Sequence, residues 1–346
     1  MRIIYTDAHA THDCAGELKD GQIVPCVETP ARARSLLEAV VQAGHGPVIA
    51  PDDMDDETAP DCLRKIHDPA YLAFLATVWS DWQREGHTTD ILPLVWPGPG
   101  MRTDLLPDTV DGRLGHYAFD VGTPICAGTW PAVIAASKAA LTGARLLDEG
   151  ADSAFCLTRP PGHHAMPGQF GGYCFVNFAA VAAQDLVDRG AARVAILDVD
   201  YHGGNGTQAI FYHRPDILTV SIHADPRVEY PYFLGYADET GEGDGDGCHM
   251  NLPLPAGTDW AAYTPALETA CARITEFGAQ ALVLSFGADT YEGDPLGRFR
   301  LTTEDYARLG QCVAALSLPT LVVMEGGYAL DALGTNTARL LDGLGM

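Results

Sequence analysis

The sequence predicts an α/β protein with three layers, in which a central, mostly parallel sheet is covered by helices on both faces. Short apolar runs alternate with amphipathic stretches over most of the chain. These runs are apolar throughout, as expected for parallel strands buried on both sides. The chain has 47% hydrophobic and only 19% charged residues, which indicates a large buried core.

The apolar runs are rich in Val, Ile and Leu, and they predict strands at Arg2–Tyr5, Ser153–Leu157, Arg193–Asp198, Ile217–Ile222, Ala281–Phe286 and Thr320–Met324. The amphipathic stretches predict helices at Ala31–Ala43, Pro69–Arg84, Pro131–Glu149, Asn177–Arg189, Trp260–Phe277, Glu304–Leu316 and Ala329–Leu341. No repeat or linker interrupts this pattern. We therefore expect residues 1–346 to form a single domain.

One long segment, from about Gly86 to Gly128, breaks the alternation. It is rich in glycine and proline and shows little periodicity. Loops of this length in compact domains usually act as lids, binding loops or interfaces. We expect this one to narrow a binding site or to form the interface of a homodimer.

The nine cysteines are scattered and include no CxxC pair. This argues against a disulfide scaffold and a thiolate zinc knot, and it favours reduced thiols in a cytoplasmic protein. The start, Met1–Asp7, reaches an acid before any apolar stretch develops, so no secretory signal is expected. The longest apolar runs are too short to span a bilayer, and no membrane partner is expected.

The net charge of −25 argues against a nucleic-acid partner, because phosphates are bound through Lys and Arg. Such a charge attracts cationic small molecules. It also serves solubility alone, so it gives only weak support for a cationic substrate.

Chemically active side chains follow five of the predicted strands. They are His163 and His164, then Asp198, Asp200 and His202, then His223, then Asp289, and finally Tyr328. Ligands of parallel α/β sheets bind outside the carboxyl ends of the strands. The pattern therefore predicts an active site at that edge.

The segment Asp198-x-Asp200-x-His202 predicts a metal site. Alternate residues of an extended segment face the same way, so Asp200 and His202 can approach one ion with Asp198 nearby. Asp289, just after its strand, is the natural third ligand. Two carboxylates and one imidazole leave a position open, which is typical of a catalytic site. Zinc, iron(II) and cobalt(II) all suit these ligands.

The pair His163-His164 follows Pro160-Pro161-Gly162 and is expected to transfer protons, since imidazole titrates near neutral pH. Tyr328 follows Glu325-Gly326-Gly327. A phenol on such a glycine turn can donate a hydrogen bond to an oxyanion.

Together these motifs resemble the histone deacetylase superfamily, and within it the bacterial acetylpolyamine amidohydrolases. The resemblance covers nearly the whole chain and implies an arginase/deacetylase-like fold. It is carried by Arg159–His164, Gly171–Cys174, Asp198–His202, Gly287–Thr290, Glu325–Tyr328, Ser221–Pro226, Tyr232–Gly235, Tyr117–Asp120 and Gly128–Trp130.

The resemblance also implies roles for individual residues. His164 would be the general base and later the acid, His163 would pair with Asp198 and stabilise charge, and Tyr328 would hold the oxyanion. A substrate tunnel is implied at Gly172, Tyr173 and Tyr230. A structural potassium ion is implied near Asp198, Asp200, His202 and Ser221.

The chain departs from the family at two positions. Gly203 replaces a second histidine beside the ligand His202. Asn205 replaces an aspartate that partners the second catalytic histidine in some members, and we expect this to alter the basicity of His164. Asp104, Asp108 and Asp111 in the long loop are candidates for gripping a distant ammonium group.

Several alternatives remain. The same catalytic core could act on acetyl-lysine, or on small N-alkyl and man-made amides, instead of acetylpolyamines. A ureohydrolase with two manganese ions needs an aspartate where this chain has Gly204, which argues against that class. A binding module without chemistry should lack a ligand or a catalytic side chain, and none is missing here.

Overall fold

The structure is a computed structural model and describes residues 1–54 and 58–345. Its strands are β1 (Arg2–Ile4), β2 (Glu17–Lys19), β3 (Gln22–Val24), β4 (Val48–Ile49), β5 (Ser153–Cys156), β6 (Val194–Asp198), β7 (Ile217–Ala224), β8 (His249–Leu254), β9 (Ala281–Phe286) and β10 (Thr320–Met324). Its α-helices are α1 (Pro30–Gln42), α2 (Thr58–Leu63), α3 (Pro69–Arg84), α4 (Val110–Tyr117), α5 (Thr129–Asp148), α6 (Phe178–Asp188), α7 (Asn205–Phe211), α8 (Trp260–Phe277), α9 (Thr303–Ala314) and α10 (Leu330–Gly343). Short 3-10 turns lie at Asp7–Thr11 and Gly243–Gly245.

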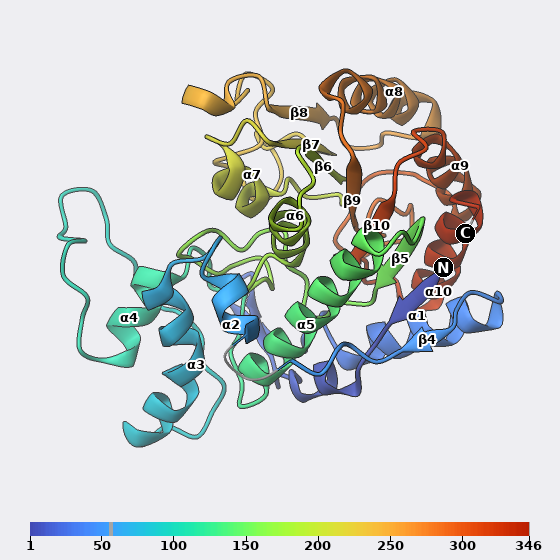
Figure 1. The fold of residues 1–346 in the computed structure, drawn as a ribbon. Helices are drawn as coiled ribbons and strands as arrows, with labels where there is room; N and C mark the ends of the chain where they lie inside the picture. The colour runs from blue at the N-terminus through green and yellow to red at the C-terminus, as the bar shows by residue number, and fades with distance from the viewer. Residues whose placement is uncertain (55–57, 346) are drawn as a thin grey trace.

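A sheet in the order β4-β1-β5-β10-β9-β6-β7-β8 forms the centre of the molecule (Figure 1). Every neighbouring pair in this sheet is parallel. All carboxyl ends therefore meet at one edge, as the sequence predicted. The strands β2 and β3 form a separate antiparallel hairpin near the amino terminus.

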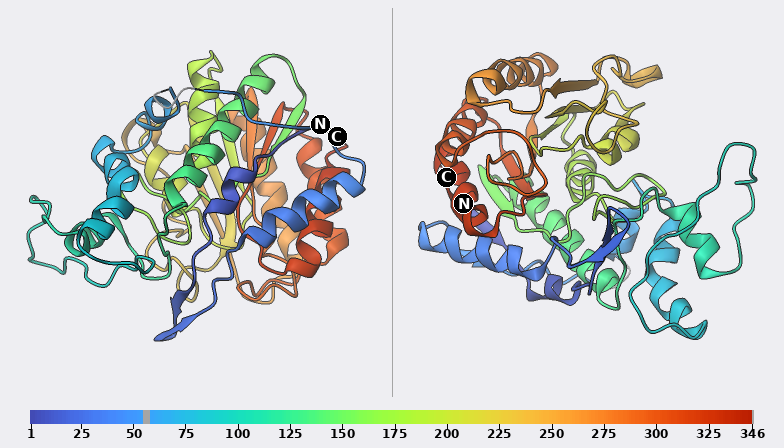
Figure 2. Two further views of the ribbon diagram at one scale, coloured as in Figure 1. Left: turned by 90° about the horizontal axis from the view of Figure 1, so that it is seen from below. Right: turned by 180° about the vertical axis from the view of Figure 1, so that it is seen from behind.

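Helices cover both faces of the sheet, which confirms the predicted three layers (Figure 2). Successive residues of one strand enter different cores: Ile196 belongs to one apolar cluster and Leu197 to the other. The first cluster packs against α3, α5 and α6, and the second against α1, α8, α9 and α10. Continuous apolar strands follow from this double burial.

The predicted strands and helices are all present, with ends that differ by a few residues at most. The prediction omitted β4, β8, the β2–β3 hairpin, α2, α4 and α7. Strand β8 is an edge strand that pairs only with β7 and contains Pro253, so it lacks the apolar run of a central strand. Strand β4 has only two residues.

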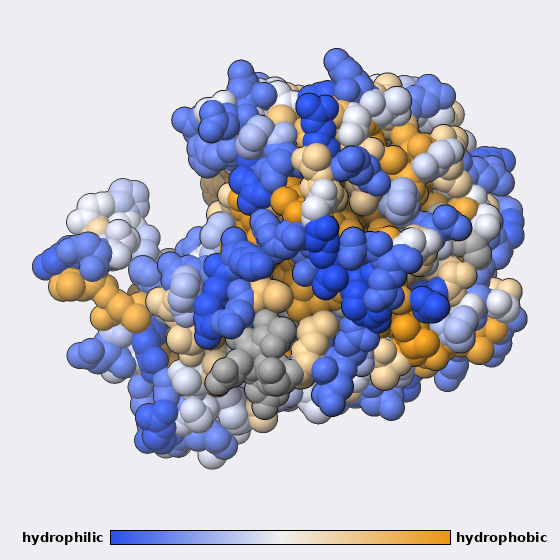
Figure 3. Space-filling view, in the orientation of Figure 1, coloured by the Kyte–Doolittle hydropathy of each residue, from blue (hydrophilic) through white to orange (hydrophobic). Residues whose placement is uncertain are grey.

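The predicted long loop contains helix α4 and a bridge between Ile91 and Ile125. Its first part, residues 92–109, extends from the body as an arm (Figure 1). Apolar side chains are exposed on this arm (Figure 3): Leu94, Val95, Met101, Leu105 and Leu106. Among the described residues, no helix combines the length and the apolarity needed to cross a bilayer.

Candidate active site

A cavity of about 590 Å³ opens at the carboxyl edge of the sheet. The residues that line it come from several strand ends and from the β2–β3 hairpin. Six of them were predicted from the sequence: His164, Gly172, Tyr173, His202, Tyr230 and Tyr328. The structure therefore brings the expected strand ends together around one hollow.

The three predicted metal ligands converge beside this cavity. One ligand atom each from Asp200, His202 and Asp289 lies within 4.8 Å of the other two. Nδ1 of His202 is 3.3 Å from Oδ1 of Asp200 and 3.1 Å from Oδ2 of Asp289. Both carboxylates are buried, while His202 borders the cavity. Of the three ligands, His202 is thus the one that faces the cavity.

Backbone groups orient both carboxylates. The N–H of Gly326 donates to Oδ2 of Asp200 at 2.9 Å, and the N–H of Tyr201 donates to Oδ1 of Asp289 at 2.9 Å. A Cβ on Gly287 would lie 1.9 Å from Oδ2 of Asp200. Glycine is therefore required there to let the loop after β9 pass the ligand.

The electrostatics of this group favour a bound cation. Burial, together with the neighbouring Asp200, raises the pKa of Asp289 to about 7. Burial also acts to raise the pKa of Asp200, but His163 and His202 outweigh it and hold that pKa below its ordinary value. Burial opposes the charge on His202, yet its hydrogen bonds to both carboxylates raise its pKa to about 10. A proton on His202 thus bridges the two carboxylates, which is the position a metal ion would take.

The donor set fits zinc in a catalytic role. Two carboxylate oxygens and one imidazole nitrogen are common zinc ligands, and such a set leaves a position open for water or substrate. The donors Asp200 and Asp289 also suit other divalent transition metals.

His163 is held as a charged group. Its Nδ1 lies 2.9 Å from Oδ2 of Asp198, and its Nε2 lies 3.8 Å from Oδ1 of Asp200. Burial acts to lower the pKa of His163, but Asp200 and Asp198 outweigh it and raise this pKa well above its ordinary value. The side chain is therefore cationic in the metal-free protein.

His164 is held as a neutral group. Burial, with further repulsion from His163 and His202, lowers the pKa of His164 well below its ordinary value. Nδ1 of His164 lies 2.6 Å from Oδ1 of Asn205, whose Nδ2 donates to the carbonyl of His164 at 3.3 Å. Because Oδ1 of Asn205 can only accept, Nδ1 of His164 must carry the proton. Its Nε2 is then free to act as a base.

Tyr328 is presented by a turn that Arg32 of α1 holds in place. The guanidinium donates to the backbone carbonyls of Glu325 and Gly327, and its Cζ lies 4.8 Å from the centre of the Tyr328 ring. The N–H of Tyr328 donates to Oδ2 of Asp294 at 2.7 Å. Burial raises the pKa of Tyr328 well above its ordinary value, so its hydroxyl stays a hydrogen-bond donor.

Tyr173 and Tyr230 line the cavity, as the family resemblance implied. The ring of Tyr230 meets that of His164 edge-on, with centroids 4.9 Å apart. Gly172 has a φ of +57°, and a Cβ on it would lie 2.2 Å from the His164 ring. Only glycine lets the backbone pass so close to His164.

Several supporting residues were not among the predicted site residues. Asp120 accepts hydrogen bonds from the Tyr230 hydroxyl and the Gly172 N–H, and so holds two parts of the cavity wall together. Glu325 accepts from the N–H groups of Gly162 and His163. Asp120 and Glu325 both lie inside motifs that carry the family resemblance, and this position could have indicated a role in the site. Arg32 lies in an ordinary helix and gave no signal.

Other predicted positions can also be placed. Ser221 pairs in register with Asp198 across β6 and β7. A Cβ on Gly204 would lie 2.4 Å from Oδ2 of Asp198, so the extra aspartate of a ureohydrolase has no room there. Three acids of the long loop are not among the residues that line the cavity: Asp104, Asp108 and Asp111.

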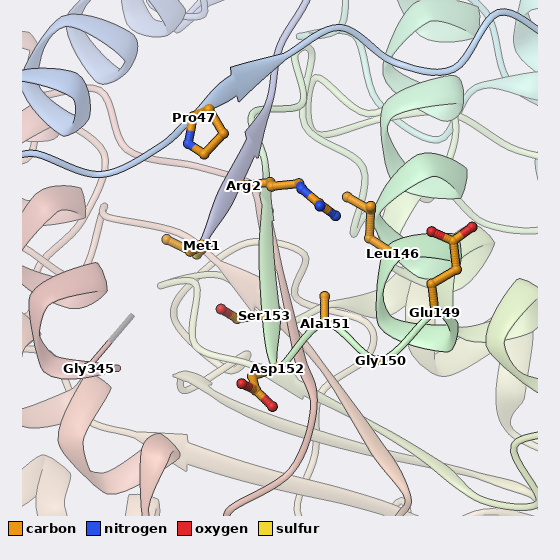
Figure 4. Close-up of a pocket in the computed structure, with 10 residues that line it drawn as sticks. All are labelled: Met1, Arg2, Pro47, Leu146, Glu149, Gly150, Ala151, Asp152, Ser153 and Gly345. Atoms are coloured by element: carbon orange, nitrogen blue, oxygen red, sulfur yellow. The ribbon is translucent and has the colours of Figure 1, made fainter.

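A second hollow lies at the opposite edge of the sheet, beside the starts of β1 and β5 (Figure 4). Arg2, Glu149 and Asp152 are the charged side chains in its lining. The lining of this hollow contains no histidine, cysteine or aromatic side chain. The chemistry is therefore concentrated at the carboxyl edge.

The fold and this site define an α/β protein with a candidate metal-ligand set and a pair of adjacent histidines at the strand ends. Residues 26–344 match the model of the histone deacetylase domain. The chain is 51% identical to acetylpolyamine amidohydrolase 1 of Pseudomonas aeruginosa, over 99% of this chain and 98% of that protein. It is 44% identical to the acetylpolyamine amidohydrolase of Mycoplana ramosa, over 99% of each chain.

A solved structure, that of acetylpolyamine aminohydrolase from Burkholderia pseudomallei, superposes with a TM-score of 0.93 at 36% identity. The match covers 100% of this chain and 98% of that one. The chain belongs to the histone deacetylase family. It is accordingly an amide-hydrolysing enzyme of the deacetylase type.

The neutral side chain of Asn205 beside His164 leads to a prediction about the pH dependence of activity. In Asn205→Asp, a carboxylate beside the ring favours the imidazolium and should raise the pKa of His164 by about one to three units. Because the base works only when neutral, activity is lost below this pKa. The acidic limb of the kcat/KM profile should therefore move to higher pH.

The control is Asn205→Ala, which removes the hydrogen bond but adds no charge, so its acidic limb should not move upward. An unmoved acidic limb in Asn205→Asp would show that His164 is not the titrating base.

Proposed function

We propose that the chain is a zinc-dependent amidohydrolase that removes the acetyl group from small N-acetylated amines, with acetylpolyamines as substrates. The observation that carries this proposal is the convergence of the Asp200–His202–Asp289 donors with a neutral His164 at one end of the cavity. The alternative is the same chemistry on other amides, either small N-alkyl amides or acetyl-lysine.

The proposed mechanism assigns one task to each side chain. A bound zinc ion would supply Lewis-acid chemistry, making the amide carbonyl more electrophilic and water more acidic. Nε2 of His164 takes the proton of the attacking water and later gives it to the leaving amine. The hydroxyl of Tyr328 donates to the oxygen that becomes negative. The cationic His163 stabilises the same charge through the low-dielectric interior.

The charges at the cavity support an amine substrate. Its lining contains the acids Glu17, Asp20, Asp120 and Glu229, against only Lys19 and Arg298 as bases. An excess of carboxylates attracts the ammonium groups of a polyamine and disfavours acidic substrates. The tyrosine walls suit the aliphatic chain between those groups.

We further infer that a structural potassium ion binds near Asp198, Asp200, His202 and Ser221. The register that places Asp198 beside Ser221 supports this proposal. We also infer that residues 1–346 form one catalytic domain, because both apolar clusters pack on the same sheet. A cytoplasmic location fits the free state of the cysteines.

The substrate assignment is tested by comparing kcat/KM of the zinc-loaded protein on acetylputrescine, acetylspermidine, an acetyl-lysine peptide and a neutral N-methyl amide. The acetylated polyamines should lead by about tenfold or more, a difference of about 1.4 kcal/mol in transition-state stabilisation. A lead of the neutral amide would retain the mechanism but contradict the polyamine assignment.

Two variants accompany this assay. Tyr328→Phe removes the oxyanion donor and should lower kcat by roughly 10²- to 10³-fold, and His164→Ala removes the base. Tyr212→Phe, outside the cavity lining, is the control and should retain activity. Full activity of Tyr328→Phe would contradict the mechanism.

We also propose that the chain forms a homodimer through the arm. The five apolar side chains exposed there support this, because monomers rarely display such groups together. Sedimentation should show a dimer for the wild type and a monomer for Leu94→Asp/Leu105→Asp. Phe233→Asp, at a position even more exposed but outside the arm, is the control and should stay dimeric. A monomeric wild type would contradict the proposal.

A further inference from the structure

A second group of metal-binding side chains lies apart from the catalytic ligands, near the amino terminus. His12 and Cys14 precede the β2–β3 hairpin, and Cys126 lies in the loop that leads into α5. One ligand atom of each lies within 4.8 Å of the other two. Nδ1 of His12 is 3.9 Å from Sγ of Cys14 and 3.8 Å from Sγ of Cys126.

These distances match the edges of a metal tetrahedron. Zinc bonds of about 2.3 Å to sulfur and about 2.0–2.1 Å to nitrogen place tetrahedral sulfur and nitrogen ligands about 3.6 Å apart. The distances from His12 to the two sulfurs exceed this by a few tenths of an ångström.

An oxygen atom lies beside two of the three ligands. Oγ1 of Thr129 lies 2.9 Å from Nδ1 of His12 and 3.6 Å from Sγ of Cys126. It also accepts a hydrogen bond from the backbone N–H of Cys126 at 2.9 Å. The hydroxyl of Thr129, or a water molecule bonded to it, can therefore complete four-coordination.

A buried carboxylate lies near the second ring nitrogen of His12, an arrangement that is common for metal-binding histidines. Nε2 of His12 lies 3.8 Å from Oε2 of Glu28, which is buried and accepts no hydrogen bond. The other oxygen of Glu28 is paired with Arg32 at 2.9 Å and with Arg159 at 2.8 Å. The free oxygen is thus aimed at the imidazole and would fix the tautomer with Nδ1 toward the metal.

The group of His12, Cys14 and Cys126 can also be reached from solvent. Cys14 is only half-buried, so an ion can enter from solvent, whereas Cys126 is buried. Metal-binding thiols must be deprotonated, so binding of the ion releases their protons.

We propose that His12, Cys14 and Cys126 form a second metal site for a thiophilic d¹⁰ ion, represented by Zn²⁺. The ion is bound by Nδ1 of His12 and two thiolate sulfurs, with the fourth position taken by Thr129 or water. Any proton still on a cysteine sulfur leaves to solvent when the ion binds. The two thiolates then offset the charge of the ion.

This site is coupled to the active-site cavity through shared residues. Glu28 pairs with Arg32, and Arg32 holds the turn that presents Tyr328. The hairpin that follows Cys14 contributes Glu17, which accepts a hydrogen bond from the Tyr173 hydroxyl at 3.1 Å. The ion would therefore anchor a segment that forms part of the cavity wall. The second ion need not take part in catalysis, because its donors are separate from Asp200, His202 and Asp289.

Cobalt(II) titration of the reduced, metal-free protein tests the proposal. A thiolate-to-cobalt charge-transfer band should appear in the near ultraviolet and saturate by two equivalents, one for this site and one for the Asp200 centre, and added Zn²⁺ should abolish it. The Asp200 centre has no sulfur ligand and cannot give this band. The titration thus reports the second site whether or not amide hydrolysis is observed.

The band should be lost in Cys14→Ser and in Cys126→Ser. Cys14 is half-exposed, so its substitution is expected to leave folding intact even if the buried Cys126 is less tolerant. Cys62→Ser, another half-buried cysteine outside the group, is the control and should retain the full band. Absence of the band in the wild type, or its survival in Cys14→Ser, would overturn the proposal.

Discussion

The carboxylates of Asp200 and Asp289 are buried next to each other, and much of the surrounding structure compensates for this proximity. Like charges in a low-dielectric interior repel strongly, and burial adds to the cost. His202 bridges the pair, and backbone N–H groups bond the remaining oxygens. The Gly287 turn exists because a side chain there would collide with Asp200. A divalent cation is the partner that satisfies this arrangement best.

The same negative centre gives the two adjacent histidines opposite properties. His163 faces Asp198 and Asp200, and their charges keep it protonated despite burial. His164 faces the neutral Asn205 and two other imidazoles, and burial keeps it unprotonated. Environments that push neighbouring pKa values apart separate a charge-stabilising group from a base. The two adjacent histidines therefore suit the two different roles proposed for them.

The sequence predicted the parts of the fold that repeat a local pattern. Buried strands such as Val194–Asp198 are continuously apolar, and the catalytic side chains follow them directly. Helix α7 was missed because it has seven residues and begins within a glycine-rich motif. Strand β8 was missed because an edge strand needs no apolar run.

Contacts between distant segments left no local pattern. Arg32 reaches the Tyr328 turn from α1, and Cys14 meets Cys126 only after folding. The scattered cysteines argued against a disulfide scaffold and a thiolate zinc knot, and all nine are free in the structure. They could not reveal the group with His12, because its spacing in sequence resembles no metal motif.

The central claim is that the ionised carboxylate of Asp289, buried beside Asp200, destabilises the protein until a cation binds, and Asp289→Asn in the metal-free protein tests it most directly. The pKa of Asp289 is raised from 3.8 to about 7, so its contribution to the free energy of unfolding falls as pH rises through that interval. Denaturant unfolding of the metal-free forms should show the variant more stable than the wild type at about pH 8, with the difference vanishing near pH 4. A wild type that is equally or more stable at about pH 8 would contradict the account.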